Sequence, residues 1–220
     1  ECETVGAPLE SALGVAIAPE WARLEGAEYR VRGAGLPERV RRGLLGGYQR
    51  ENLRIVLRAV QLLRDRGWAI PSNAVRQGLA QARWPGRSEV VHRRPAVVLE
   101  GAHNPAGVEE LARDVVRWAP DRNRRWLVLG VLADKDVDAI VRTVAPLFPR
   151  VAVCRSESAR ALATDELARR VRTYGIEPSC YDSVIRAVRD TVARADPEDV
   201  VVVTGARTVV AAARRALCTG

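Results

Sequence analysis

The sequence is poor in several features, and their scarcity limits what kind of protein it can be. Among 220 residues there is no methionine and only one phenylalanine. Since even an initiator methionine is absent, we expect that Glu1 is not the first residue of the translated gene. Apolar runs such as Val200 to Val203 are far shorter than the roughly 20 residues that span a bilayer. No basic and then apolar leader opens the chain, so we expect no membrane partner.

Cysteine is scarce too, and its spacing argues against a metal site. The four cysteines are far apart, without a C-x-x-C pair and with few histidines near them. Metal ligation needs clustered ligands. We therefore expect no metal ligands in this chain and four buried, reduced thiols of a cytoplasmic protein, namely Cys2, Cys154, Cys180 and Cys218.

Lysine occurs once, at Lys135, although 35 residues are Lys or Arg and the formal net charge is +8. A basic chain suggests nucleic-acid binding. Arginine is scattered through every predicted element, however, so we interpret the charge as an arginine-for-lysine bias and expect no nucleic-acid partner. The lysine between Asp134 and Asp136 is either a compact ammonium that a site requires or a solvated loop charge.

The first part of the chain predicts one strand and two helices. Residues 27–33 alternate like a half-exposed strand. Helical periodicity follows over 49–66 and again over 71–83. A Trp-Pro-Gly-Arg sequence at 84–87 then breaks the pattern as a hinge or domain boundary. Four residues of the first helix are predicted to share one face: Asn52, Val56, Ala59 and Leu63.

Two polar residues near this boundary are open to two interpretations each. Asn52 is either a satisfied buried amide or an amide that reads a base. Arg87 either stacks on or pairs with an anion, or it is a surface residue of the hinge.

From residue 89 onward, short apolar runs alternate with amphipathic helices. Strands are predicted over 96–99, 126–130, 151–154, 177–181 and 200–204. Helices are predicted over 105–118, 137–147, 165–174, 183–195 and 208–217. Nearly continuous Val, Leu and Ile strands separated by helices imply a parallel sheet covered on both faces. We therefore expect a doubly wound α/β domain over about 89–220.

Polar residues follow three of these strands, where ligands bind in such a sheet. They lie at 100–105, at 134–136 after Gly130, and at 204–207. Helix capping accounts fully for Asn104 and Pro105. A carboxylate and an imidazole beside a helix N-terminus, at Glu100 and His103, could instead hold a phosphate or a nucleotide sugar.

Several catalytic motifs are absent from these residues. The one lysine follows Asp134, so there is no Walker A motif and no lysine and magnesium clamp for phosphoryl transfer. No G-x-G-x-x-G follows the first strand of the α/β domain, which argues against a dehydrogenase. No G-x-S-x-G is present either.

In their order, the motifs resemble the second half of the folylpolyglutamate synthase/dihydrofolate synthase family of the Mur ligase superfamily. The resemblance runs from Gly6 over nearly the whole chain. It rests on Gly47-Tyr48-Gln49-x-x-Asn52, Trp84-Pro85-Gly86-Arg87-Ser88-Glu89, Glu100-Gly101-Ala102-His103-Asn104-Pro105, Asp134-Lys135-Asp136 and Thr204-Gly205.

The resemblance implies a domain organisation. Residues 1–86 would be the C-terminal remnant of a central ATPase domain, and 87–220 a Rossmann-like C-terminal domain. The P-loop and the ligands for Mg²⁺ would belong to an N-terminal ATPase half that is missing here and is the expected partner. We therefore expect a truncated ligase, or a remnant that turns over nothing alone.

The resemblance also implies an activity and site residues. In the family the terminal carboxylate of a folate or pteroate is phosphorylated by ATP, and the glutamate amine then attacks the acyl phosphate to form an amide. The implied nucleotide contacts are Asn52, Arg87 and Glu100. The implied catalytic residues of the cleft are His103 and Lys135, and those on the substrate side are Asp134, Asp136, Thr204 and Gly205.

This chain departs from the family pattern at three positions. The family usually has His at Tyr48, Asp at Glu100 and Ser at Ala206. Glu100 extends its carboxylate by one bond, roughly 1.5 Å, which is either absorbed locally or weakens a ribose contact. A non-catalytic α/β binding or assembly module and a related Mur-type amino-acid ligase remain alternative interpretations.

Overall fold

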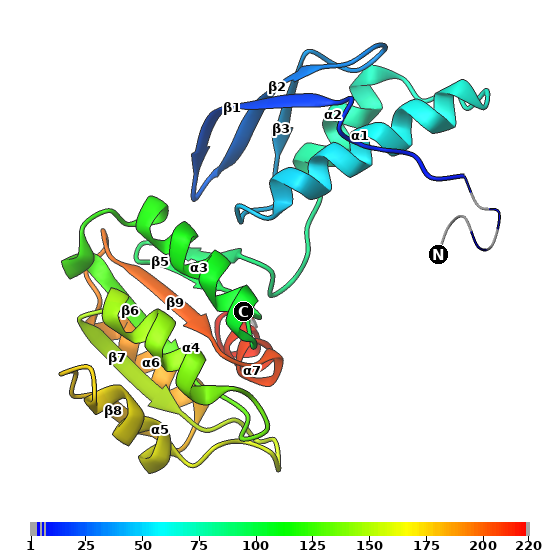
Figure 1. Cartoon of the computed structure of the whole chain (residues 1–220). Coiled ribbons are helices and arrows are strands. Elements are labelled where there is room, and N and C mark those ends of the chain that lie inside the picture. The colour runs from blue at the N-terminus through cyan, green and yellow to red at the C-terminus, as the bar shows by residue number, and fades with distance from the viewer. Residues whose placement is uncertain (1–3, 5, 7, 219–220) are drawn as a thin grey trace. The chain divides into compact units, whose positions relative to one another are not determined.

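The computed structural model describes residues 4, 6 and 8–218, and the chain forms two compact units, Glu1–Arg83 and Trp84–Gly220. Figure 1 shows that each unit has its own sheet and its own helices. No helix in the described part of the chain is long and apolar enough to cross a membrane.

The first unit is a three-stranded antiparallel sheet with two helices. The strands, in spatial order, are β1 (Ala16–Arg23), β2 (Gly26–Arg32) and β3 (Arg39–Arg42). The helices are α1 (Gln49–Asp65) and α2 (Ser72–Gln81). Apolar residues of both layers form one core, which includes Ile17, Tyr29, Val31, Val40, Leu53, Leu57 and Val75.

The predicted strand and both helices of this unit are confirmed, but β1 and β3 were not predicted. β3 contains three arginines, so its sequence lacks the apolar run that marks a buried strand. One of them, Arg42, is buried all the same. Its guanidinium lies 5.4 Å from the Tyr29 ring centroid and donates a 3.0 Å hydrogen bond to the carbonyl of Gly46.

Helix α1 buries a different face from the one that its spacing predicted. Gln49, Leu53 and Leu57 are buried, whereas Asn52 and Val56 are exposed. The amide of Asn52 donates a 2.9 Å hydrogen bond to Gln49 Oε1. The interpretation of Asn52 as a buried amide is therefore wrong. The helix carries two apolar stripes, and spacing alone does not tell which one a sheet covers.

The second unit contains a six-stranded sheet in the order β4-β5-β9-β6-β7-β8. The strands from β5 to β8 are parallel, and β4 is an antiparallel edge strand. The prediction of an α/β fold with a parallel sheet is confirmed, whereas β4 was not predicted. The bounds are β4 Glu89–Arg93, β5 Ala96–Leu99, β6 Arg125–Leu129, β7 Arg150–Cys154, β8 Ser179–Tyr181 and β9 Val200–Thr204.

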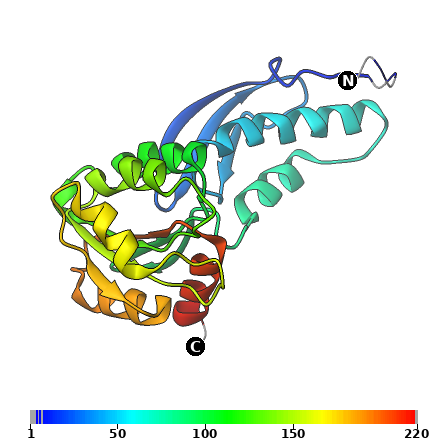
Figure 2. The ribbon, with the colours of Figure 1, turned by 60° about the horizontal axis from the view of Figure 1, so that its bottom comes forward.

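Helices cover both faces of this sheet (Figures 1 and 2). α3 packs against α4, and α6 packs against α7. Alternate residues of the strands, such as Val97, Val128 and Val201, share a core with α6 and α7. The helix bounds are α3 Pro105–Trp118, α4 Val137–Val144, α5 Thr164–Arg172, α6 Val184–Arg194 and α7 Arg207–Cys218, with 3-10 turns at Arg122–Arg124 and Ala145–Leu147.

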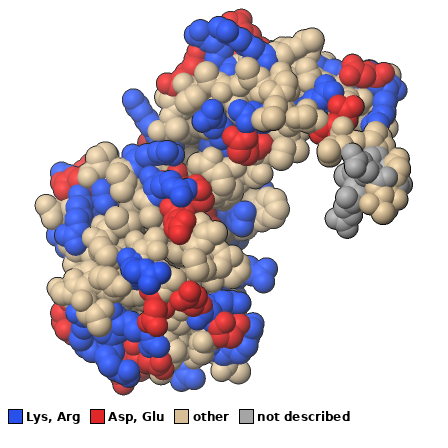
Figure 3. Space-filling view, in the orientation of Figure 1, with Lys and Arg blue, Asp and Glu red and all other residues tan. Residues whose placement is uncertain are grey.

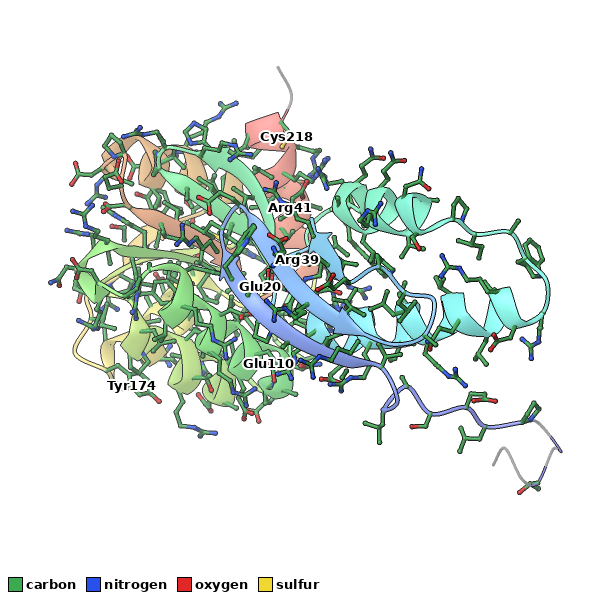
Figure 4. All side chains as sticks on the ribbon, turned by 90° about the horizontal axis from the view of Figure 1, so that it is seen from above. Glu20, Arg39, Arg41, Glu110, Tyr174 and Cys218 are labelled. Atoms are coloured by element: carbon green, nitrogen blue, oxygen red, sulfur yellow. The ribbon has the colours of Figure 1, made fainter. Side chains whose placement is uncertain are left out.

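The cysteines do not share one environment. Cys154 is buried, and burial raises the pKa of its thiol to about 12. Cys180 and Cys218 are exposed, so the prediction that they are buried is wrong. Cys180 lies on the edge strand β8, and Cys218 is the last residue of α7 (Figure 4). Cys2 lies outside the described residues.

Charges of both signs are mixed on the surface. On the face that Figure 3 shows, Lys and Arg side chains alternate with Asp and Glu. In the small sheet of the first unit, for example, Glu20 forms one ion pair with Arg30, at 3.0 Å, and another with Arg39, at 3.7 Å. Figure 4 labels Glu20 and Arg39 on that sheet. Such exposed pairs contribute little to stability.

Candidate functional site

The strand order of the second unit brings three polar segments to one edge of the sheet. β9 lies between β5 and β6, and all three are parallel. Leu99 pairs with Val203, and Leu129 pairs with Thr204. The segments at 100–105, 130–136 and 204–207 therefore leave the sheet side by side, at the carboxyl edge where ligands bind in such folds.

Two glycines allow these strand ends to approach closely. The Gly205 N–H donates to the Ala102 carbonyl at 3.1 Å, and the Gly130 N–H donates to the Thr204 carbonyl at 3.3 Å. Gly205 has a φ of +104°, and a Cβ there would lie 2.5 Å from the Gly130 carbonyl oxygen. A side chain at position 205 would therefore force the ends of β9 and β6 apart.

Thr204 has a structural partner within this edge. It is fully buried, and its hydroxyl lies 2.7 Å from the Glu100 carbonyl and 3.3 Å from the Ala102 carbonyl. The hydroxyl therefore ties the end of β9 to the segment that follows β5. A substrate contact by Thr204 or Gly205 stays a prediction.

Glu100 is a buried acidic residue, and only 5% of its surface is exposed. The Ser88 hydroxyl donates to Glu100 Oε2 at 2.6 Å. Burial raises the pKa of Glu100, and this effect is opposed by the Ser88 hydrogen bond and the positive charge of Arg87. The Glu100 carboxylate is thus held by Ser88, a partner that the sequence reasoning missed. A nucleotide contact by Glu100 stays a prediction.

The segment at 84–89 is tied to the same strand end. The Gly86 N–H donates to Glu89 Oε2 at 2.9 Å, and Gly86 accepts a 2.9 Å bond from the Gly101 N–H. The Arg87 guanidinium is 5.8 Å from the Trp84 ring centroid, within range of a cation–π contact. Arg87 is exposed, and its stacking partner is supplied by the chain itself.

His103 and Asn104 occupy the turn from β5 into α3. The Asn104 side chain accepts a 2.8 Å hydrogen bond from the Gly107 N–H and Pro105 follows as the first helical residue, so the predicted capping is confirmed. His103 Nδ1 lies 2.8 Å from the Gly101 carbonyl. Since a carbonyl only accepts, Nδ1 carries the proton, and in the neutral ring Nε2 is then an acceptor.

Lys135 lies in a small ionic cluster after β6. Its Nζ is 3.2 Å from Asp134 Oδ2, and Arg160 Nη1 is also 3.2 Å from that oxygen. The hydrogen bond from Lys135, together with the charge of Arg160, lowers the pKa of Asp134. Asp136 instead caps α4, accepting from the Ala139 N–H at 3.0 Å. Sequence reasoning missed Arg160, which is 25 residues from Lys135 and joins it through tertiary structure.

The candidate residues thus fall into three groups. Arg87, Glu100, Thr204 and Gly205 are linked by contacts around the end of β5, with His103 on the same turn. Lys135 and Asp134 follow β6, which is separated from β5 by β9. Asn52 belongs to the first unit. Within residues 4, 6 and 8–218, no group of three or more His, Cys, Asp or Glu side chains could hold a metal ion.

Comparison with known proteins relates the chain to a ligase family. Residues 86–207 match the family model "Mur ligase, glutamate ligase domain". The chain is 37% identical over 176 residues to a probable bifunctional folylpolyglutamate synthase/dihydropteroate synthase of Haloferax volcanii, covering 80% of this chain and 20% of that protein. It is 38% identical over 129 residues to the dihydrofolate synthase/folylpolyglutamate synthase of Mycobacterium tuberculosis, covering 57% of this chain and 26% of that protein.

Solved structures agree over the whole chain. Folylpolyglutamate synthase of M. tuberculosis, complexed with ADP and AMPPCP, has a TM-score of 0.78 at 28% identity and is matched over 51% of its length. Folylpolyglutamate synthase of Thermotoga maritima has a TM-score of 0.84 at 25% identity and is matched over 50%. The chain thus spans about half the length of these structures. Its family model covers more than half of its residues, and the chain therefore belongs to the Mur ligase family.

Proposed function

We propose that this chain is the C-terminal part of an ATP-dependent ligase that adds L-glutamate to tetrahydrofolate or dihydropteroate through an acyl phosphate. The family supports the ligase class, and the similarity to folylpolyglutamate synthases supports the substrates. The observation that carries the proposal is the shared edge of β5, β9 and β6, because it gathers three separate motifs. Such a ligase would act in folate metabolism in the cytoplasm.

The residues of this edge suit charge stabilisation better than covalent catalysis. Phosphoryl and acyl transfer depend mainly on positioning and on stabilisation of developing charge. Lys135, held by Asp134, offers an ammonium toward negative charge that develops on a phosphoryl group. His103, with Nδ1 fixed on Gly101, presents Nε2 as an acceptor for a proton of the attacking amine. Arg87 and Trp84 form an exposed cation and ring pair that suits a nucleotide.

In the part of the chain that the structure describes, no three His, Cys, Asp or Glu side chains gather into a group that could hold a metal ion. ATP, when bound, supplies the phosphoryl group. We propose that its phosphates and metal are held by an N-terminal ATPase half, since the 220 residues contain no Walker A motif. The first unit would complete that ATPase domain, with Asn52 on an exposed stripe of α1 facing the nucleotide.

The proposal is tested by supplying the ATPase half. The chain is joined to the N-terminal half of the M. tuberculosis relative, and incorporation of radiolabelled glutamate into tetrahydrofolate is measured with ADP release. We expect both products from the joined protein and no ADP from the chain alone. ADP release by the chain alone would contradict the expectation that the chain lacks the groups that clamp the transferring phosphate. ATP hydrolysis by the joined protein without glutamate incorporation would contradict the ligase assignment.

A further inference from the structure

The segment at 84–87 forms a tight turn that carries the exposed pair of Trp84 and Arg87. The Arg87 N–H donates to the Trp84 carbonyl at 3.2 Å, which closes a turn of four residues. Proline occupies its second position, and Gly86, at the third, has a φ of +74°. Both features are typical of a type II turn. The turn therefore fixes the directions in which the backbone presents Trp84 and Arg87.

Helix α7 holds this turn at two places on one face of the helix. A Cβ at Gly86 would lie 2.7 Å from Cγ1 of Val210, so the backbone of the turn lies directly against α7. Four residues further along the helix, Arg214 Nε lies 3.2 Å from Glu89 Oε1 and 3.1 Å from Glu89 Oε2. Since residues four apart share a helix face, Val210 and Arg214 approach the segment from the same side.

Glu89 connects the helix to the turn. Its Oε2 accepts the Gly86 N–H at 2.9 Å as well as the hydrogen bond from Arg214. The backbone of Glu89 is fixed as the first residue of β4, where it pairs with Leu99 of β5. Gly86 is thus held at both of its polar backbone groups, the N–H by Glu89 and the carbonyl by the Gly101 N–H at 2.9 Å.

We infer that Glu89 and Arg214 are positioning residues for nucleotide binding, which hold the turn so that Trp84 and Arg87 face the nucleotide in one geometry. Neither residue of this anchor, Glu89 and Arg214, touches the nucleotide itself. Binding to a pair that is already ordered costs less conformational entropy than binding to a mobile one. The inference deepens the proposed function and rests on it for the identity of the ligand.

The first test is amide hydrogen exchange of the 220-residue chain, which measures the anchor without a ligand. Arg214→Ala removes its cation, and Glu89→Ala removes both hydrogen bonds of the carboxylate. The Gly86 and Arg87 amides should exchange faster in both variants, by about tenfold in Glu89→Ala, as expected for loss of a charge-assisted hydrogen bond. A local opening accelerates only the amides that it exposes. An unchanged Gly86 amide, or equal acceleration of the β5 amides, would overturn the anchor.

The second test measures the affinity for ADP by calorimetry, in the chain joined to the N-terminal half of the M. tuberculosis relative. Glu89→Gln keeps an acceptor for the Gly86 N–H but loses the charge, so it should match Arg214→Ala. Each should weaken ADP binding by roughly threefold to fivefold, as expected for a partly exposed ion pair. Glu89→Ala should weaken it by about tenfold, because the bond to Gly86 is lost as well.

A double variant and a control show whether the two residues act through one another. Glu89→Gln combined with Arg214→Ala should bind ADP no more weakly than either single variant, whereas independent effects would add. Arg172→Ala is the matched control, because it breaks an exposed ion pair of α5 with Glu177 and should leave the ADP affinity unchanged. Additive losses, or parental affinity in every variant of Glu89 and Arg214, would overturn the positioning role.

The inference and the proposed function fail separately. If the joined protein incorporates glutamate while the Glu89 and Arg214 variants bind ADP as the parent does, the positioning role fails and the ligase function stands. If the variants lose ADP affinity in the expected order while the joined protein forms no amide, the ligase function fails and the positioning role stands. A loss of stability alone would leave the ADP affinity of the folded protein unchanged.

Discussion

Ser88 and Glu100 form a buried hydrogen bond of 2.6 Å that closes the segment at 84–89 onto the end of β5. Ser88 adopts a left-handed backbone conformation, with φ of +47°, which is unfavourable for a residue with a side chain. Arg87 immediately precedes it. The bond between Ser88 and Glu100 therefore holds Arg87 at the sheet edge where the other candidate residues emerge.

Two substitutions of Ser88 should separate the effect of its hydrogen bond on stability from the effect of its backbone strain. Ser88→Ala leaves the buried Glu100 carboxylate without its hydroxyl donor and should lower the free energy of unfolding by about 1–3 kcal/mol. Ser88→Gly removes the same donor but relieves the left-handed strain, by about 1–2 kcal/mol, so it should be less destabilising than alanine. Urea unfolding followed by circular dichroism measures both. Alanine proving no more destabilising than glycine would contradict the strain at Ser88.

Glu100 should make stability fall as pH rises. Its pKa is raised above 4.5 in the folded protein, so the folded state holds the proton more tightly than the unfolded chain. Its contribution is fully present below about pH 4.5 and is lost as pH rises through the folded pKa. Glu100→Gln has no such proton. The unfolding free energy of the parent minus that of this variant should therefore decrease with pH and then level off.

Glu177 provides the control for this pH series, because its shift has the opposite sign. The hydrogen bond from Arg172 lowers the pKa of this exposed carboxylate. Its contribution is present above the unfolded pKa and is lost as pH falls through the folded one. The difference between the parent and Glu177→Gln should therefore increase with pH. A Glu100→Gln difference with this same slope would contradict the burial of Glu100.

The parallel part of the sheet could be predicted from sequence because each strand is a short, nearly continuous apolar run. β5 and β9 begin and end at the predicted residues. The three missed strands lack that signal. β3 is rich in arginine, and β4 is an edge strand whose residues are all partly or fully exposed. Their pairing partners, rather than their own composition, determine that they are strands.

The candidate site, too, could be predicted from the sequence only in part. Glu100, His103 and Thr204 could be located because ligands bind at strand ends in a parallel sheet. The partners of those residues could not be located. Ser88 reaches Glu100 through a left-handed backbone, and Arg160 reaches Asp134 across 26 residues. Both contacts depend on tertiary geometry, which hydrophobic periodicity does not predict.

Gly205 should tolerate no side chain. A Cβ at this position meets the Gly130 carbonyl oxygen at 2.5 Å, so Gly205→Ala should combine backbone strain of about 1–2 kcal/mol with a steric clash. Gly175→Ala is the control, since Gly175 also has a positive φ, +72°, but nothing lies within 4 Å of its Cβ position. Thermal unfolding should show a larger loss of stability for Gly205→Ala than for Gly175→Ala. Equal losses would mean that the strand ends do not meet as described.

The thiols should react in a set order. Cys180 and Cys218 are exposed, whereas Cys154 is buried with its pKa raised to about 12. Since the thiolate is the reactive form, iodoacetamide at neutral pH should label Cys180 and Cys218 in the folded chain and Cys154 only after unfolding. Peptide mass mapping with and without urea reads this out. Labelling of Cys154 at the rate of Cys180 in the folded chain would contradict its burial.

Lys135 should be required for catalysis in the joined ligase, and a compact ammonium should be needed there. Loss of one group that stabilises developing charge costs about 10²–10³ in kcat, so Lys135→Ala should fall in that range, with circular dichroism unchanged. Lys135→Arg should restore little, because a planar guanidinium presents its donors differently from an ammonium. Arg160→Ala is the control: it removes the other cation on Asp134 and should change kcat by less than about tenfold. Full activity of Lys135→Ala would instead establish Lys135 as a solvated loop charge, since its ion pair with Asp134 is partly exposed and weak.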